Sequence, residues 1–133
     1  MGHKVNTEKS KFILIERNSL LTAVVKGIQE VKGEDLKILD LREIENSICD
    51  YFVICTARSS TNAKALADSV QKETEVELDD SPWHVEGKDN AEWILMDYSE
   101  LVVHIFTDTT RDFYNLEELW ADAPEVLVKE LVQ

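Results

Sequence analysis

The segment 51–55, Tyr-Phe-Val-Ile-Cys, is the feature that most constrains the fold of this chain. An unbroken run of aromatic and β-branched residues is typical of a strand covered on both faces, so we expect it in the middle of a sheet. The segment 36–41 alternates apolar and polar residues imperfectly and predicts a further strand. The chain has 133 residues, within the usual size range of one domain, and we expect residues 1–133 to form a single domain.

Apolar residues at helical spacing predict three helices. The first should cover about 18–32, because Ser19 precedes an apolar stripe and Gly33 follows it. The second should begin at Ser59 or Ser60 and fray into the acidic stretch 73–80. The third should cover 110–120 and pack on the sheet through its stripe of Phe113, Leu116, Leu119 and Trp120. Residues 12–15 fit either a strand or a first helical turn, and 126–132 fit one or two further amphipathic turns.

Two alternating runs, 93–98 and 101–106, are separated only by Ser99 and Glu100 and predict a β-hairpin. A short strand is expected just before it, at 83–86, ending at Gly87. Successive side chains of a strand point to opposite faces of the sheet. The core face should carry Ile94, Met96, Leu101, Val103 and Ile105, with Tyr98 at its edge. The second face should carry Trp93, Leu95, Asp97, Val102, His104 and Phe106.

This second face combines large aromatic side chains with a carboxylate and an imidazole. That composition is typical of an interface rather than of a fully buried layer, so we predict a partner-binding surface. The alternative is that a helix covers the face, in which case His104 is a buried histidine with its hydrogen bonds satisfied.

The charge of the chain restricts its partners. Lys and Arg total 14 against 27 Asp and Glu, which gives a formal net charge of −13. Such a surface repels the phosphate backbone, so direct nucleic-acid binding is not expected. It suits a basic protein partner, although negative charge also serves solubility alone.

The residues capable of chemistry form no assembled motif. Cys49 and Cys55 lack a C-x-x-C pattern, and no G-x-S-x-G motif or glycine-rich phosphate loop is present. His84 and Glu86 make only a weak H-x-E metal pattern. We therefore predict no catalytic residues, no metal and no cofactor. Since no apolar run approaches the ~20 residues that span a membrane, a cytoplasmic protein without membrane contact is expected.

Two blocks of sequence resemble the RsfS family, also called Iojap or ribosomal silencing factor. The first block is Asp50 to Cys55 followed by Ser59 and Ser60, which is similar to the family signature D-Y-F-V-I-x-x-x-x-S. The second block is more specific, and it follows the family patterns E-G, W-x-L-x-D-Y, V-V-H-x-F and R-x-x-Y-x-L-E-x-L-W. Its residues are 86–87, 93–98, 102–106 and 111–120. The resemblance covers about 19–121 and leaves 1–17 and 122–133 as extensions.

The resemblance implies an α/β fold with a mixed five-stranded sheet and flanking helices, similar to nucleotidyltransferases but without their catalytic residues. It implies a non-enzymatic factor that binds the large ribosomal subunit through the ribosomal protein called L-fourteen. Binding would block subunit joining and repress translation, and the family tends to form homodimers. The partner-binding residues it implies, together with the imidazole of the second face, are Trp93, Asp97, Tyr98, Glu86, Gly87 and His104.

Two residues of this chain depart from the family pattern, and two functions other than ribosome binding are open as alternatives. Ser99 stands where the family commonly has glycine, and a positive φ there costs about 1 kcal/mol relative to Gly, so a longer or bulged turn is an alternative. Arg58 stands where a small residue is frequent. The other functions are a nucleotidyltransferase-like enzyme that holds Mg²⁺ with Asp40 and Asp50, and a homodimeric interaction module unrelated to ribosomes.

Overall fold

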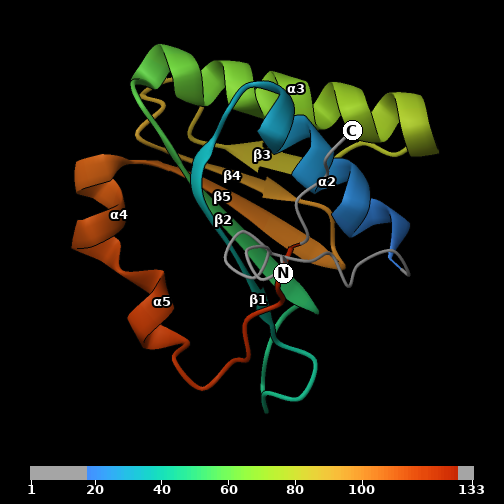
Figure 1. Cartoon of the computed structure of the whole chain (residues 1–133), viewed down its shortest axis with the longest axis vertical. Coiled ribbons are helices and arrows are strands. Elements are labelled where there is room, and N and C mark those ends of the chain that lie inside the picture. The colour runs from blue at the N-terminus through green and yellow to red at the C-terminus, as the bar shows by residue number, and fades with distance from the viewer. Residues whose placement is uncertain (1–17, 129–133) are drawn as a thin grey trace, which may run out of the picture.

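The computed structural model describes residues 18–128, which contain five strands and four helices (Figure 1). In chain order these are α2 (Ser19–Glu30), β1 (Glu34–Asp40), β2 (Tyr51–Ala57), α3 (Ser60–Leu78), β3 (His84–Glu86), β4 (Trp93–Asp97), β5 (Leu101–Thr107), α4 (Asp108–Tyr114) and α5 (Leu116–Leu119). The segment 12–15, expected to be a strand or a helical turn, lies outside the described residues. No helix between residues 18 and 128 has the length and apolar character needed to cross a membrane.

The strands form one mixed sheet in the order β1-β2-β5-β4-β3. β2 and β5 run parallel, whereas the other three neighbouring pairs are antiparallel. Every residue of β2 is buried between its two neighbours, which confirms the prediction of an internal strand. The expected mixed five-stranded α/β fold is confirmed, and the sheet is compatible with the expected likeness to nucleotidyltransferases.

Helices α2 and α3 lie side by side over one face of the sheet (Figure 1). They approach closely at Gly27, where a Cβ atom would lie 2.7 Å from the Cα of Val70. The Ser69 hydroxyl donates to the Gly27 carbonyl at 2.7 Å across the same contact. The helices cover the predicted core face of the hairpin, whose five apolar residues are all fully buried. The assignment of faces by strand parity is therefore confirmed on this side.

The second face is covered in part by α5 and the chain that follows it. Leu116, Trp120 and Ala123 pack on buried side chains of β1, β2 and β5. The chain then runs along β1, where the Asp40 amide donates to the Pro124 carbonyl and the Val126 amide to the Ile38 carbonyl, both at 2.8 Å. Residues 126–128 are not helical, and the rest of the amphipathic segment predicted at 126–132 lies outside the described residues.

Two helix predictions are wrong in detail. The helix predicted over 110–120 is broken at Asn115, whose left-handed φ of 45° ends α4 and precedes α5. As a result Phe113 is 79% and Leu119 is 72% exposed, instead of packing on the sheet. The acidic stretch 73–80 does not fray, since α3 continues to Leu78 and ends at Asp79 with a left-handed φ of 56°.

The hairpin turn forms without glycine and without a bulge. The pairing of β4 with β5 is uninterrupted up to Asp97 and Val102. Ser99 adopts a φ of 76°, so the positive φ considered from the sequence is present. The Ser99 amide donates to Asp97 Oδ1 at 2.8 Å, which offsets part of the cost of that backbone conformation.

Candidate partner-binding surface

The cover over the second face stops short of the sheet edge formed by β3 and β4. In the register of these strands, His84 faces Asp97 and Glu86 faces Leu95, so all four side chains lie on the second face. His84 and Glu86 are exposed, and Trp93, Leu95 and Asp97 are half-buried. We call these five residues the open strip. It places one large aromatic side chain and two carboxylates on the same accessible face, with Leu95 between Trp93 and Asp97 along β4.

Trp93 contacts two aromatic rings. It stacks on Phe106 of β5 with ring centroids 5.0 Å apart, and Tyr114 of α4 lies against it at 4.6 Å. Its indole Nε1 donates a hydrogen bond to Nδ1 of His104 at 3.1 Å. The side chain is therefore fixed in place while part of it stays accessible, which is the arrangement expected of an interface anchor.

His104 lies beneath Trp93 and is only 4% exposed. The Phe52 ring makes a T-shaped contact with the imidazole at a centroid distance of 4.6 Å. Because the indole can only donate, Nδ1 must accept and the ring proton resides on Nε2. Nε2 is buried and has no hydrogen-bond partner in residues 18–128. Burial lowers the pKa of His104 to about 4, so the imidazole is neutral at physiological pH.

The second face, which was predicted to be a partner-binding surface, is only partly accessible. Val102, His104 and Phe106 are buried, because cover from α5 and from the 41–50 loop was not visible in the hairpin sequence. The alternative was a covered face in which His104 is buried with its hydrogen bonds satisfied. His104 is indeed buried, but its Nε2 has no hydrogen-bond partner in the described residues. Only the open strip retains the predicted accessibility.

The other predicted site residues occupy different environments. Tyr98 is buried on the core side, and its hydroxyl lies 3.0 Å from the Thr74 hydroxyl of α3. Burial raises the pKa of Tyr98 to about 12. Gly87 has a φ of +88°, and a Cβ atom there would lie 2.1 Å from the Trp93 carbonyl oxygen. Gly87 therefore shapes the approach to β4, and Tyr98 and His104 do not face solvent in the free protein.

Exposed aromatic residues outside the predicted set extend the surface. Trp83, just before β3, is 69% exposed, with its ring 5.7 Å from that of His84. Phe113 contacts Tyr114 at a ring distance of 5.0 Å and so continues the aromatic row that begins at Trp93. Helical spacing had placed Phe113 in the core, and only the break at Asn115 reveals that it faces outward.

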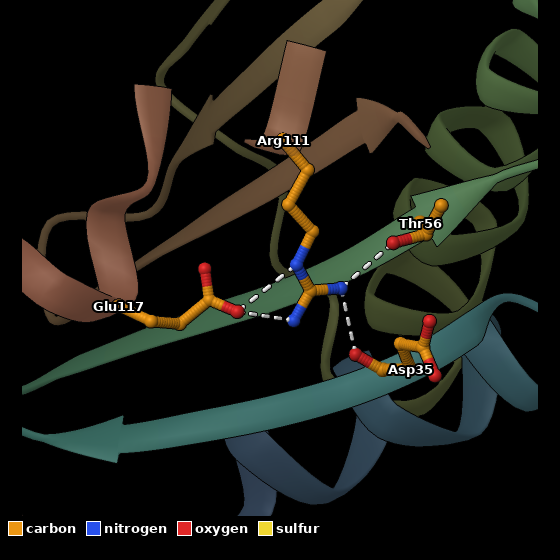
Figure 2. A network of polar contacts seen from close by, with 4 residues as sticks. All are labelled: Asp35, Thr56, Arg111 and Glu117. Carbon is orange, nitrogen blue, oxygen red and sulfur yellow. Dashed lines mark hydrogen bonds and ion pairs between the residues drawn. The ribbon is translucent and has the colours of Figure 1, made fainter. Parts of the chain in front are cut away.

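An arginine network holds the covering helices on the sheet. Figure 2 shows Arg111 of α4 reaching between α5, β1 and β2. Its Nε and Nη2 donate to Glu117 at 3.0 and 2.6 Å, and its Nη1 donates to Thr56 Oγ1 at 2.7 Å and to the Asp35 carbonyl at 2.8 Å. The ion pair with Glu117 lowers the pKa of that carboxyl against the opposing effect of its burial. The network thereby fixes the elements that carry Tyr114 and Trp120.

The residues considered as catalytic or metal-binding candidates either pair with other side chains or are at least partly buried. The Asp40 carboxylate accepts from Nε and Nη2 of Arg42 at 3.0 and 2.8 Å. Cys55 is fully buried in the first-face core and Cys49 packs on the second face, so the sheet separates the thiols. Burial raises the pKa of Cys49 to about 11 and of Cys55 to about 12. Residues 18–128 contain no cluster of three or more metal-binding side chains.

Together the fold and the surface define a small α/β protein with an accessible strip of aromatic and acidic side chains on one face of its sheet. Comparison with known proteins agrees with this class. A family model described as "Ribosomal silencing factor during starvation" matches residues 15–133. The ribosomal silencing factor of Bacillus subtilis (strain 168) is 34% identical over 110 residues, which cover 83% of this chain and 92% of that protein.

Two further proteins are similar. A Mus musculus protein named "Mitochondrial assembly of ribosomal large subunit protein 1" is 33% identical over 99 residues, covering 73% of this chain and 43% of that protein. A crystal structure of a protein from Chromobacterium violaceum matches with a TM-score of 0.74 at 27% identity, covering 89% of this chain and 92% of that one. The chain belongs to the ribosomal silencing factor (RsfS) family, and its role is that of a ribosome-associated regulator.

Proposed function

We propose that this protein binds the large ribosomal subunit through a basic ribosomal protein, the one called L-fourteen, and blocks joining of the small subunit. The observation that carries the proposal is the open strip, in which the fixed Trp93 shares an accessible face with Glu86 and Asp97. The name of the mouse relative, which refers to the large ribosomal subunit, supports the choice of subunit.

The proposed mechanism is steric and requires no chemistry. Partly buried aromatic side chains are frequent anchors at protein interfaces, and the surrounding contacts exclude water from them. The two carboxylates and the net charge of −13 favour encounter with a basic surface over encounter with RNA phosphates. Once bound, the protein occupies the space that the small subunit needs, and translation falls.

Sedimentation of purified subunits tests the proposal. At a magnesium concentration that normally permits joining, we expect the protein to co-migrate with the large subunit and to abolish the peak of joined ribosomes. Trp93→Ala should weaken large-subunit binding about tenfold or more, because an anchor is lost. Val76→Ala is the control, since Val76 is 71% exposed on α3, over the opposite face of the sheet.

Because Trp93 also packs on its neighbours, its replacement is expected to lower stability as well. Circular dichroism melting establishes whether Trp93→Ala remains folded at the temperature of the binding assay. A folded Trp93→Ala variant that co-sediments like the unaltered protein would remove the open strip from the interface. Unaffected joining with the protein at the top of the gradient would reject the function itself.

Homodimerisation through the same surface is a second candidate, favoured by the exposed aromatic residues Trp83 and Phe113 beside the open strip. If one surface serves both contacts, the large subunit and a second copy compete for it. Light scattering should then show a dimer that Trp93→Ala weakens.

No observation favours the nucleotidyltransferase alternative, since the Asp40 carboxylate is already bound by Arg42.

A further inference from the structure

Trp93 has a single polar atom, and its hydrogen bond selects one orientation of the ring. Stacking on Phe106 at an interplanar angle of 29° and a tilted contact with Tyr114 at 44° restrain the plane of the indole. Stacking alone tolerates a ring that is flipped or shifted within that plane, because torsions of this type are broad and roughly two-fold. The hydrogen bond from Nε1 to His104 Nδ1 at 3.1 Å distinguishes between these orientations.

The sheet register brings His104 within reach of Trp93. Trp93 pairs with Phe106 and Leu95 pairs with His104, so His104 is the diagonal neighbour of Trp93 across β4 and β5. Diagonal pairs lie within reach of long aromatic side chains. His104 is itself held by a T-shaped contact with Phe52 at 4.6 Å, and Phe52 is contacted by Trp120 at 5.5 Å. The orientation of Trp93 therefore depends on a buried and well-packed acceptor.

Stability alone does not account for an imidazole at this position. Its Nε2 is a buried donor without a partner in the described part of the chain, and such a group is unfavourable. A leucine would fit a largely apolar layer of Phe52, Ile54 and Val102 without that cost. What the imidazole supplies, and leucine would not, is the acceptor for the Trp93 indole.

We propose that His104 is a positioning residue for the partner-binding surface, since its buried Nδ1 accepts the Trp93 indole N–H and so sets the orientation in which the partner meets that ring. This inference rests on the proposed function, in which Trp93 contacts the large subunit. It reassigns His104 from a contact residue to one that acts through Trp93.

Two nearly isosteric variants test the inference. His104→Leu removes the acceptor, whereas His104→Asn keeps an oxygen close to the place of Nδ1. We expect His104→Leu to be at least as stable in urea as His104→Asn, yet to bind the large subunit about fivefold more weakly, which corresponds to one hydrogen bond. His104→Asn should keep most of the affinity. The inference would be overturned if the less stable of the two variants were also the weaker binder. It would also be overturned if both variants bound the large subunit as tightly as the unaltered protein.

A measurement on the free protein separates this inference from the proposed function. The three tryptophans give three indole N–H signals in a ¹⁵N NMR spectrum, and Trp93→Phe identifies the signal of Trp93. That signal should move in His104→Leu and return toward its original position in His104→Asn. Ile54→Val is the control, because it loosens the same buried layer without removing the acceptor, and it should leave both signal and affinity unchanged.

The two possible failures then look different. If Trp93→Ala still binds the large subunit, the proposed contact fails, and the positioning role fails with it. If Trp93→Ala loses binding but the Trp93 indole signal is the same in His104→Leu, the proposed function stands and the positioning role is rejected.

Discussion

At the scale of single residues, the buried imidazole of His104 makes stability depend on pH. Burial lowers its pKa to about 4 in the folded state, against an ordinary value of 6.5. Above pH 6.5 the imidazole is neutral in both the folded and the unfolded state, so its protonation does not reduce the free energy of unfolding. As the pH falls from 6.5 toward 4, only the unfolded state binds the proton, so the free energy of unfolding decreases, by about 3 kcal/mol over the whole window.

Urea unfolding of the unaltered protein and of His104→Leu between pH 8 and pH 4 measures this effect. Both proteins carry the same carboxylates, so the difference between their unfolding free energies isolates the imidazole. We expect the difference to be constant above about pH 7 and to move in favour of His104→Leu at lower pH. A difference that stays flat down to pH 4 would show that His104 titrates normally in the folded protein.

At the scale of elements, the Arg111 network determines how firmly α4 and α5 cover the sheet. Arg111 is only 12% exposed and donates to groups on three other elements. Arg111→Lys keeps the charge but loses the planar arrangement of donors, so we expect it to lower the free energy of unfolding by roughly 1–3 kcal/mol. Amide exchange should accelerate in α4 and α5 more than in α2 and α3.

The control for this variant is Lys88→Met, which removes an ion pair between Lys88 and Asp68. That pair is 2.8 Å long, against 2.6 Å for Arg111 and Glu117, but it is largely exposed. Exposed pairs contribute little, so a change within about 0.5 kcal/mol is expected. Equal destabilisation by the two variants, or uniform acceleration of amide exchange, would contradict a local role for Arg111.

The same elements show what the sequence could and could not predict. Strand parity identified the core face of the hairpin, because a period of two leaves no ambiguity once one face is apolar. The helix over 110–120 was predicted to be continuous because apolar spacing does not signal the left-handed conformation of Asn115. In a continuous helix Arg111 and Glu117, six positions apart, would lie on different faces. Only the break at Asn115 lets them pair. The cover over His104 depends on contacts between distant segments, which hairpin periodicity does not encode.

At the scale of the whole molecule, the sequence predicts the sign of the charge, and the fold determines which acidic residues accompany the aromatic surface. Asp97 and Glu86 lie in the open strip, whereas Glu30 lies at the end of α2, over the opposite face of the sheet. If a basic partner meets the open strip, long-range attraction should raise the rate of association, and salt should screen it.

Stopped-flow binding to the large subunit at increasing KCl tests this attraction. We expect the association rate to fall by roughly tenfold from low to physiological ionic strength, where the Debye length is about 8 Å, while the dissociation rate changes much less. Asp97→Asn, whose side-chain oxygen can still accept from the Ser99 amide at the turn, should slow association more than Glu30→Gln, although both remove one negative charge. Equal effects of the two variants would mean that only the net charge matters and that the open strip is not the surface that meets the partner.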